Sequence, residues 1–123
     1  MSYGRIGVIG AMDSELAALI AALTQPAQET VQGLAFRTGR LGAREVVLVR
    51  CGIGKVSAAR CTQVLIDRFA PGAVINTGIA GGLASGLAVG DIVVADGLVQ
   101  HDFDAAPIGF VRGGVCMGAP GAP

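Results

Sequence analysis

Two stretches of the sequence combine residue types and spacing that chemistry requires. Glu15 lies in the first turn of a predicted helix, directly after "GVIGAM" at residues 7–12. A carboxylate there either interacts favourably with the helix dipole or faces a cleft, where it can take a proton from water. The segment "GIAGGLASG" at residues 78–86 follows a predicted strand. Its glycines indicate either a plain connector or a loop whose backbone contacts a flat ligand, because no Cβ intervenes.

Three other motifs match their best-known functions poorly. "GVIGAM" lacks the glycine spacing of a dinucleotide-binding loop. "CGIGKVSA" at residues 51–58 resembles the end of a phosphate-binding loop. The first glycine of such a loop would fall at Val49, before this segment, and Val56 replaces the hydroxyl residue that holds magnesium. "HDFD" at residues 101–104 offers one imidazole and two carboxylates, which are more typical of solvated or interface positions than of a metal site. We therefore expect no metal and no organic cofactor.

The elements that would position these residues alternate between strands and helices. Short apolar, β-branched runs predict strands at residues 5–10, 44–50, 73–77 and 91–102. Residues 34–51 hold two strand-like stretches around Gly39–Gly42, which predicts a hairpin. This order predicts an α/β fold with a mostly parallel sheet and an antiparallel element.

Helical spacing of apolar residues predicts two helices, at residues 11–23 and 54–69. We expect Asp13 or Ser14 to cap the first helix and Pro26 to mark its end. In the second helix one side carries an apolar row, composed of Ala58, Cys61, Leu65 and Phe69.

Composition restricts the classes of partner. Nine basic residues balance nine acidic ones, and the chain has no Trp and one Tyr, so we expect no nucleic-acid partner. The uncharged run at residues 69–90 contains Pro71 and six glycines, which make it a poor membrane helix, so we expect no membrane association. Three cysteines without a CxxC pair, in a sequence without a recognisable secretory leader, favour a reducing cytoplasm.

Four motifs together resemble those of one enzyme family. "IGVIGAMDSEL", "VVLVRCGIGKVSAA", "VINTGIAGGL" and "VGDIVVADGLVQHDFD" occur in the order and spacing of the 5′-methylthioadenosine/S-adenosylhomocysteine nucleosidases. The resemblance runs from Arg5 to Phe110 and implies the nucleoside phosphorylase fold, a three-layer αβα sandwich with a mostly parallel mixed sheet. It also implies that residues 1–104 are the N-terminal half of such a domain, incomplete as it stands, and that residues 105–123 are a Gly/Pro-rich loop or tail.

The resemblance implies roles for individual residues. Glu15 would help to activate the attacking water, Met12 and Ile53 would lie against the ribose and its alkylthio group, and Ala80 and Gly81 would pack along the purine. Ile79 stands where the family often has Ser or Thr, so a hydroxyl contact would be lost. In a family homodimer, the positions of Ala105 and Ile108 reach the partner subunit's pocket.

The implied reaction is hydrolysis of an N-glycosidic bond that releases adenine, without a cofactor. In the family, the second half of the chain supplies the acid that protonates adenine and the groups that grip the ribose, and none of these can be assigned here. Whether this chain is itself an enzyme therefore depends on association with a missing C-terminal half. Two alternatives remain open: another purine nucleosidase or phosphorylase of the same fold, of the futalosine or inosine type, and a non-catalytic dimerising or ligand-binding module.

Cysteine usage gives a first testable prediction. We expect Cys51, Cys61 and Cys116 to be free thiols, because a strand end and a helix use cysteine as a small apolar residue and no spacing suggests a bridge. Thiol titration in denaturant without reductant should count three. A count of one would reveal a disulfide and contradict the cytoplasmic expectation.

Overall fold

The protein is described here by a computed structural model, which describes residues 4–113. Its internal contacts divide it into two units, Met1–Gly81 and Gly82–Pro123, and each is considered by itself. All the strands among the described residues belong to the first unit. The division of the sequence into a half-domain at residues 1–104 and a tail at residues 105–123 follows the family resemblance rather than these contacts, and it stays a prediction.

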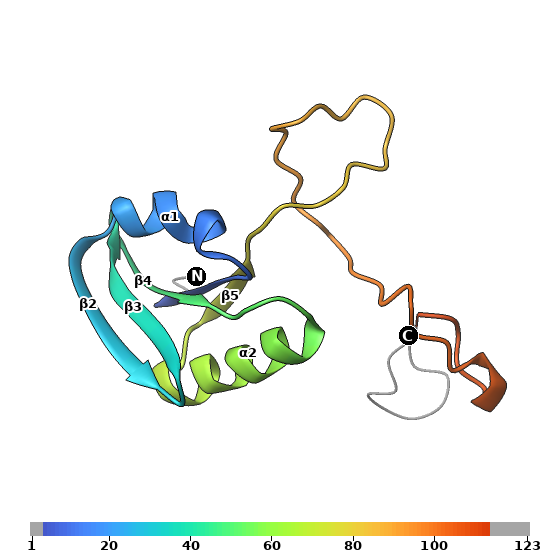
Figure 1. Cartoon of the computed structure of the whole chain (residues 1–123), viewed down its shortest axis with the longest axis horizontal. Helices are drawn as coiled ribbons and strands as arrows, with labels where there is room; N and C mark the ends of the chain where they lie inside the picture. The colour runs from blue at the N-terminus through green and yellow to red at the C-terminus, as the bar shows by residue number, and fades with distance from the viewer. Residues whose placement is uncertain (1–3, 114–123) are drawn as a thin grey trace. The chain divides into compact units, whose positions relative to one another are not determined.

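The first unit is a mixed sheet between two helices (Figure 1). The sheet has five strands in the order β2-β3-β4-β1-β5. Strand β1 runs parallel to its neighbours β4 and β5, whereas β2, β3 and β4 form antiparallel hairpins. The elements are β1 (Ile6–Gly10), α1 (Asp13–Ala21), β2 (Thr24–Val31), β3 (Leu34–Leu41), β4 (Arg44–Arg50), α2 (Lys55–Phe69) and β5 (Ala73–Asn76). The predicted strands at residues 5–10, 44–50 and 73–77, the hairpin and both helices are therefore confirmed.

The helices cover opposite faces of the sheet, which makes three layers (Figure 1). Because side chains alternate along a strand, neighbouring residues of β1 serve different faces. Val8 packs with Leu16 of α1, whereas Ile9 packs with Leu65 of α2. The expected three-layer αβα fold is confirmed.

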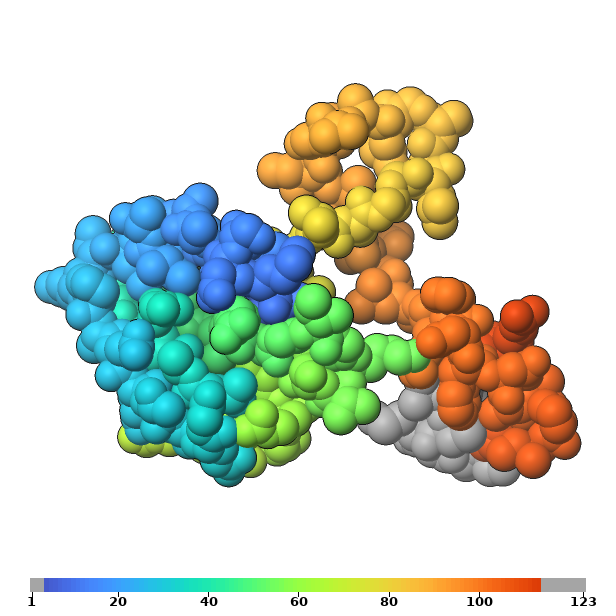
Figure 2. All heavy atoms as spheres, in the orientation of Figure 1, coloured from blue at the N-terminus to red at the C-terminus, as the bar shows by residue number. Residues whose placement is uncertain are grey.

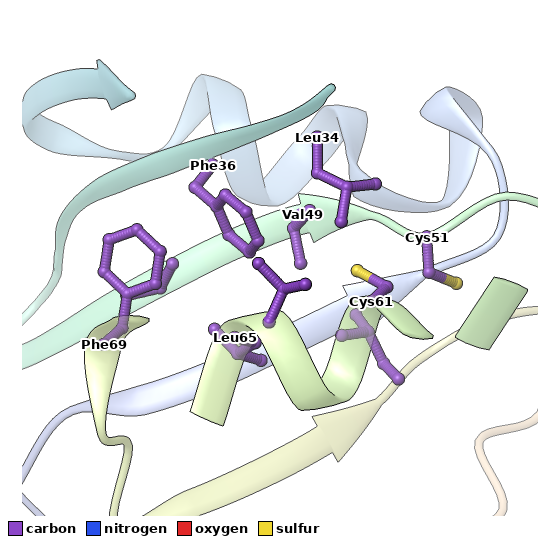
Figure 3. Packing of buried hydrophobic residues seen from close by; sticks show 10 residues of the cluster. Leu34, Phe36, Val49, Cys51, Cys61, Leu65 and Phe69 are labelled. Carbon is purple, nitrogen blue, oxygen red and sulfur yellow. The ribbon is translucent and has the colours of Figure 1, made fainter. Parts of the chain in front are cut away.

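The larger core lies between the sheet and α2 (Figure 3). The rings of Phe36 and Phe69 meet there, with centroids 4.8 Å apart and planes tilted by 43°, a favourable aromatic geometry. Cys51 and Cys61 lie in the same cluster as buried free thiols, as predicted. Cys116 lies outside the described residues.

Two glycines of β1 determine how closely the helices approach the sheet. A Cβ on Gly7 would lie 2.6 Å from Leu65 Cδ2 of α2. A Cβ on Gly10, which faces the other way, would lie 2.9 Å from Leu16 Cγ of α1. Real Cβ atoms do not tolerate such distances, so both helices pack on β1 through a position that has no side chain.

The sequence did not reveal β2. Its sequence, "TQPAQETV", has no apolar alternation, and most of its residues are exposed because it forms one edge of the sheet. Pro26, expected only to end the helix, lies inside this strand, where an edge position tolerates a missing N–H. A register shift between Thr24 and Ala27 accompanies it.

The predicted strand at residues 91–102 is wrong in this structure. These residues form no strand, and the apolar side chains of Ile92, Val93 and Val94 are exposed. A β-branched run becomes a strand only when a neighbouring strand pairs with it, so the pattern alone was insufficient. In this second unit the one helical element among the described residues is a short 3-10 turn, Ala106–Ile108. Within residues 4–113, no helix combines the length and the apolarity that crossing a bilayer requires.

The close packing at Gly7 predicts the effect of one added methyl group. We expect Gly7→Ala to lower the free energy of unfolding by about 1–3 kcal/mol, because the added Cβ would force the fully buried Leu65 side chain to shift within a packed core. Leu65→Ala alone should cost about 2–5 kcal/mol, and adding Gly7→Ala to it should cost much less than in the wild type. Urea denaturation would measure all three. Gly97→Ala, where no atom lies within 4 Å, is the control; equal effects at Gly7 and Gly97 would contradict this account.

Candidate functional site

Three chain segments meet at the carboxyl end of β1. The Cys51 N–H, just after β4, donates to the Gly10 carbonyl at 2.9 Å. On the other side, the Thr77 N–H, just after β5, donates to the Ile9 carbonyl, also at 2.9 Å. Helix α1 begins from the same end of β1. Ligands of open α/β sheets bind at this end, because the loops that follow parallel strands gather there.

Glu15 reaches back over the start of α1. It is the third residue of the helix, and its Oε2 accepts the N–H of Met12, the N-cap, at 2.9 Å. The expected capping by Asp13 or Ser14 is therefore wrong, because Asp13 is already the first helical residue and the cap residue lies one position earlier. Glu15 thus satisfies a backbone donor that the start of a helix leaves free.

The other carboxylate oxygen of Glu15 binds the glycine-rich segment. Its Oε1 accepts the N–H of Ile79 at 3.1 Å. The preceding residue must be small, because a Cβ on Gly78 would lie 2.7 Å from the same oxygen. Glu15 therefore joins the segments after β1 and β5 directly, a contact between residues 64 positions apart.

These bonds keep Glu15 ionised. The backbone N–H of Met12, followed by that of Ile79, lowers the pKa of the Glu15 carboxyl below its ordinary value, while partial burial opposes them. The negative charge of Glu15 also acts on Cys51, the residue just after β4. Burial raises the pKa of the Cys51 thiol, and the charge of Glu15 raises it further by a smaller amount. The site therefore contains a half-buried carboxylate whose ionised form is stabilised by two backbone N–H groups.

Of the other predicted site residues in the first unit, Met12 and Ile79 contact this carboxylate through their backbone N–H groups. Met12 is half-buried beside it, and Ile79 contacts it through the backbone while its side chain is 83% exposed. Ala80 and Gly81 follow and are exposed. Ile53 lies two residues beyond Cys51 and is 77% exposed. The apolar side chains expected to contact a ligand are thus open to solvent, and their roles stay predictions.

Ala105 and Ile108 belong to the second unit, so the site around Glu15 is built without them. Ala105 is buried and Ile108 is exposed, and their assignment to a partner's pocket stays a prediction. In the nearby "HDFD" motif, Asp104 accepts the N–H of Ala106 at 2.9 Å at the start of the 3-10 turn. Throughout the described range, residues 4–113, no three His, Cys, Asp or Glu side chains gather as a metal site would require.

A pocket of about 260 Å³ at the carboxyl end of β4 was not predicted from the sequence. Its charged residues are Asp13, Arg37 and Arg50, and Arg50 Nε lies 3.4 Å from Asp13 Oδ1. Buried Leu34 and Cys51 contribute apolar walls. No motif announces this group, because its members come from three elements that only the fold brings together.

The sequence matches the phosphorylase superfamily over residues 5–122. Among curated relatives, a 5′-methylthioadenosine/S-adenosylhomocysteine nucleosidase from Shewanella putrefaciens is 48% identical over 109 residues, which are 89% of this chain and 47% of the relative. The corresponding nucleosidase from Shewanella pealeana is 45% identical over the same length. This chain thus spans about half the length of the curated relatives it matches.

Solved structures give the same picture. The nucleosidase from Colwellia psychrerythraea, determined in complex with adenine, superposes with a TM-score of 0.91 at 41% identity, covering 97% of this chain and 49% of that one. The S-adenosylhomocysteine nucleosidase from Streptococcus pyogenes, in complex with 5-methylthiotubericidin, also gives 0.91, at 42% identity and coverage of 98% and 51%.

The contact between Glu15 and Gly78 yields a prediction for pH dependence. Gly78→Ala should displace the carboxylate from the Ile79 N–H, so the Glu15 pKa should rise toward its ordinary value. A carboxyl group whose pKa is lower in the folded state than in the unfolded state stabilises the fold at pH values above the unfolded-state pKa. This stabilisation is lost as the pH falls through the folded-state pKa. Because the folded-state pKa is higher in the variant, the variant should lose it at a higher pH than the wild type. Carboxyl-detected NMR titration would measure the pKa. Gly81→Ala, with open space around it, is the control, and an unchanged pKa in Gly78→Ala would contradict the prediction.

Proposed function

The chain belongs to the phosphorylase superfamily, and from this premise we propose that it is the Glu15-bearing half of a nucleosidase that hydrolyses 5′-methylthioadenosine and S-adenosylhomocysteine to release adenine. One observation carries the proposal. Glu15 is a carboxylate held at the carboxyl end of β1 by backbone donors from two different segments, and these donors lower its pKa.

The chemistry of N-glycosidic hydrolysis assigns a clear task to such a group. As the bond to the purine lengthens, positive charge develops on the ribose, and water attacks from the face opposite the departing base. A carboxylate on that face accepts the proton of the water, as the base of an inverting glycosidase does. Because both oxygens of Glu15 are anchored, the remaining lone pairs of the carboxylate have a fixed direction toward such a water.

The glycine-rich segment supports a purine beside this carboxylate. Ala80 and Gly81 immediately follow the residue that donates to Glu15, so a flat ring lying along their backbone would place its sugar near Oε1. Exposed Ile53 and half-buried Met12 would contact the sugar and its 5′ substituent. All of these assignments follow the family resemblance onto matching positions of this sequence.

The departing adenine must also be protonated, and no residue of this chain is assigned to that step. The curated relatives are about twice as long as the segment they share with it. We therefore propose that activity requires association with a second half, in a homodimeric assembly to which Ala105 and Ile108 contribute. We place the protein in the cytoplasm, in the salvage of methionine, because its buried cysteines are free thiols and its relatives are nucleosidases of methylthioadenosine.

The proposal predicts the effect of removing the base. In an assembly of this chain with the separately expressed second half of the Shewanella putrefaciens relative, Glu15→Gln should lower kcat for adenine release from methylthioadenosine by about 10²–10⁴-fold. The chain without a second half should release adenine at no useful rate, because none of its residues is assigned as the general acid that protonates the departing adenine. A coupled assay for adenine would measure both.

Glu45→Gln is the matched control, since Glu45 is an exposed carboxylate at the opposite end of β4. It should leave kcat unchanged. Near-wild-type turnover by Glu15→Gln would return Glu15 to a purely structural role at the start of α1.

A further inference from the structure

The pocket at the carboxyl end of β4 is lined by three charged side chains, those of Asp13, Arg37 and Arg50. On β4, Arg50 shares a sheet face with Leu48, which packs toward α1, and Arg37 lies opposite Leu48 on β3. Both guanidinium groups therefore line the α1 side of the sheet, near the N-terminus of that helix. Asp13, in the first turn of α1, adds one carboxylate. Two cations and one anion thus surround a single pocket.

The two arginines differ in how they are occupied. Arg50 forms an ion pair with Asp13 at 3.4 Å, but both side chains are exposed, so the pair is weak and leaves other N–H donors of the guanidinium available. Half-buried Arg37 forms no ion pair or side-chain hydrogen bond within residues 4–113. The pocket therefore offers two guanidinium groups for a carboxylate and, beside Arg50, the Asp13 carboxylate for a cation.

The pocket lies next to the end of β1 from which α1 and Glu15 follow. Cys51 lines the pocket, and its N–H donates to the Gly10 carbonyl at 2.9 Å. The order of strands β3-β4-β1-β5 sets a direction: the glycine-rich segment follows β5, Glu15 lies over β1, and the pocket lies over β4 and β3. Neighbouring strands are about 4.8 Å apart, so this row spans the length of a nucleoside that carries an extended 5′ substituent.

We propose that the pocket of Asp13, Arg37 and Arg50 binds the α-amino-acid end of a 5′-thioether nucleoside, the end that S-adenosylhomocysteine has and methylthioadenosine lacks. The inference rests on the proposed function and adds to it a determinant of substrate preference. The α-carboxylate pairs with Arg37 and Arg50, and the α-ammonium pairs with Asp13. Such a zwitterion matches all three charges, whereas inorganic phosphate would leave Asp13 facing an anion.

The test compares two nucleosides that differ at this end. The labelled chain is assembled with the second half of the Shewanella putrefaciens relative, in the Glu15→Gln background so that neither nucleoside is consumed. Its arginine side-chain Nε–H signals are followed by NMR during titration with S-adenosylhomocysteine, with methylthioadenosine and with inorganic phosphate. We expect S-adenosylhomocysteine alone to shift the signals of Arg37 and Arg50, and both nucleosides to shift the amide signals of Met12 and Ile79. Arg37→Gln and Arg50→Gln should each weaken binding of S-adenosylhomocysteine about tenfold, the loss of one charge-assisted hydrogen bond, and leave methylthioadenosine unaffected.

Arg44→Gln is the control, because Arg44 is an exposed arginine at the far end of β4. If both nucleosides shift Met12 and Ile79 but neither shifts the arginines, this inference fails and the proposed function stands. If neither nucleoside shifts any signal, both fail. A stronger arginine response to phosphate than to S-adenosylhomocysteine would also overturn the inference, since it would identify an anion site of another kind.

Discussion

The contact of two helices with one bare strand is the constraint on which the rest of this structure depends. Gly7 admits Leu65 of α2 on one face of β1, and Gly10 admits Leu16 of α1 on the other. Close packing is a property of protein interiors in general, but here it passes through two positions of a five-residue strand. Because Leu16 follows Glu15 directly, seating the helix on Gly10 also fixes where the carboxylate stands. The packing of Leu16 in the core therefore also determines the position of Glu15 at the site.

Glu15 makes two hydrogen bonds to different parts of the chain. One oxygen completes the start of α1 and the other binds the segment after β5. A capping carboxylate is ordinarily local, since it serves only its own helix. Here the second bond turns it into a link between loops, and the same donors that hold it also keep it ionised. The structural role follows from these two bonds, and the proposed role as a base would use the same anchoring, because a fixed carboxylate has a fixed direction.

The sequence revealed those elements whose pattern reports burial. Strands β1, β4 and β5 are apolar runs, and α2 presents a regular row from Cys61 to Phe69, so all were predictable. Strand β2 was not, because an exposed edge strand needs no apolar alternation. Residues 91–102 show the converse, since they have the composition of a strand without a paired neighbour. At the site, the place of Glu15 in the first turn left its role open, and the family resemblance supplied an expected role that stays a prediction. The bond of Glu15 to Ile79 and the meeting of Arg37 with Arg50 were not predictable, because both depend on which strands become neighbours.

The two edges of the sheet differ in kind. On one side β2 carries Pro26, a register shift and exposed polar side chains, features that discourage a further strand from pairing. On the other side β5 has four residues, with Val74 and Ile75 38% and 50% exposed and with no proline. A further strand can therefore pair more readily with β5 than with β2. Any strand added to β5, from this chain or another, would extend the structure from the side on which the glycine-rich segment begins, and would thereby form a new wall next to Glu15.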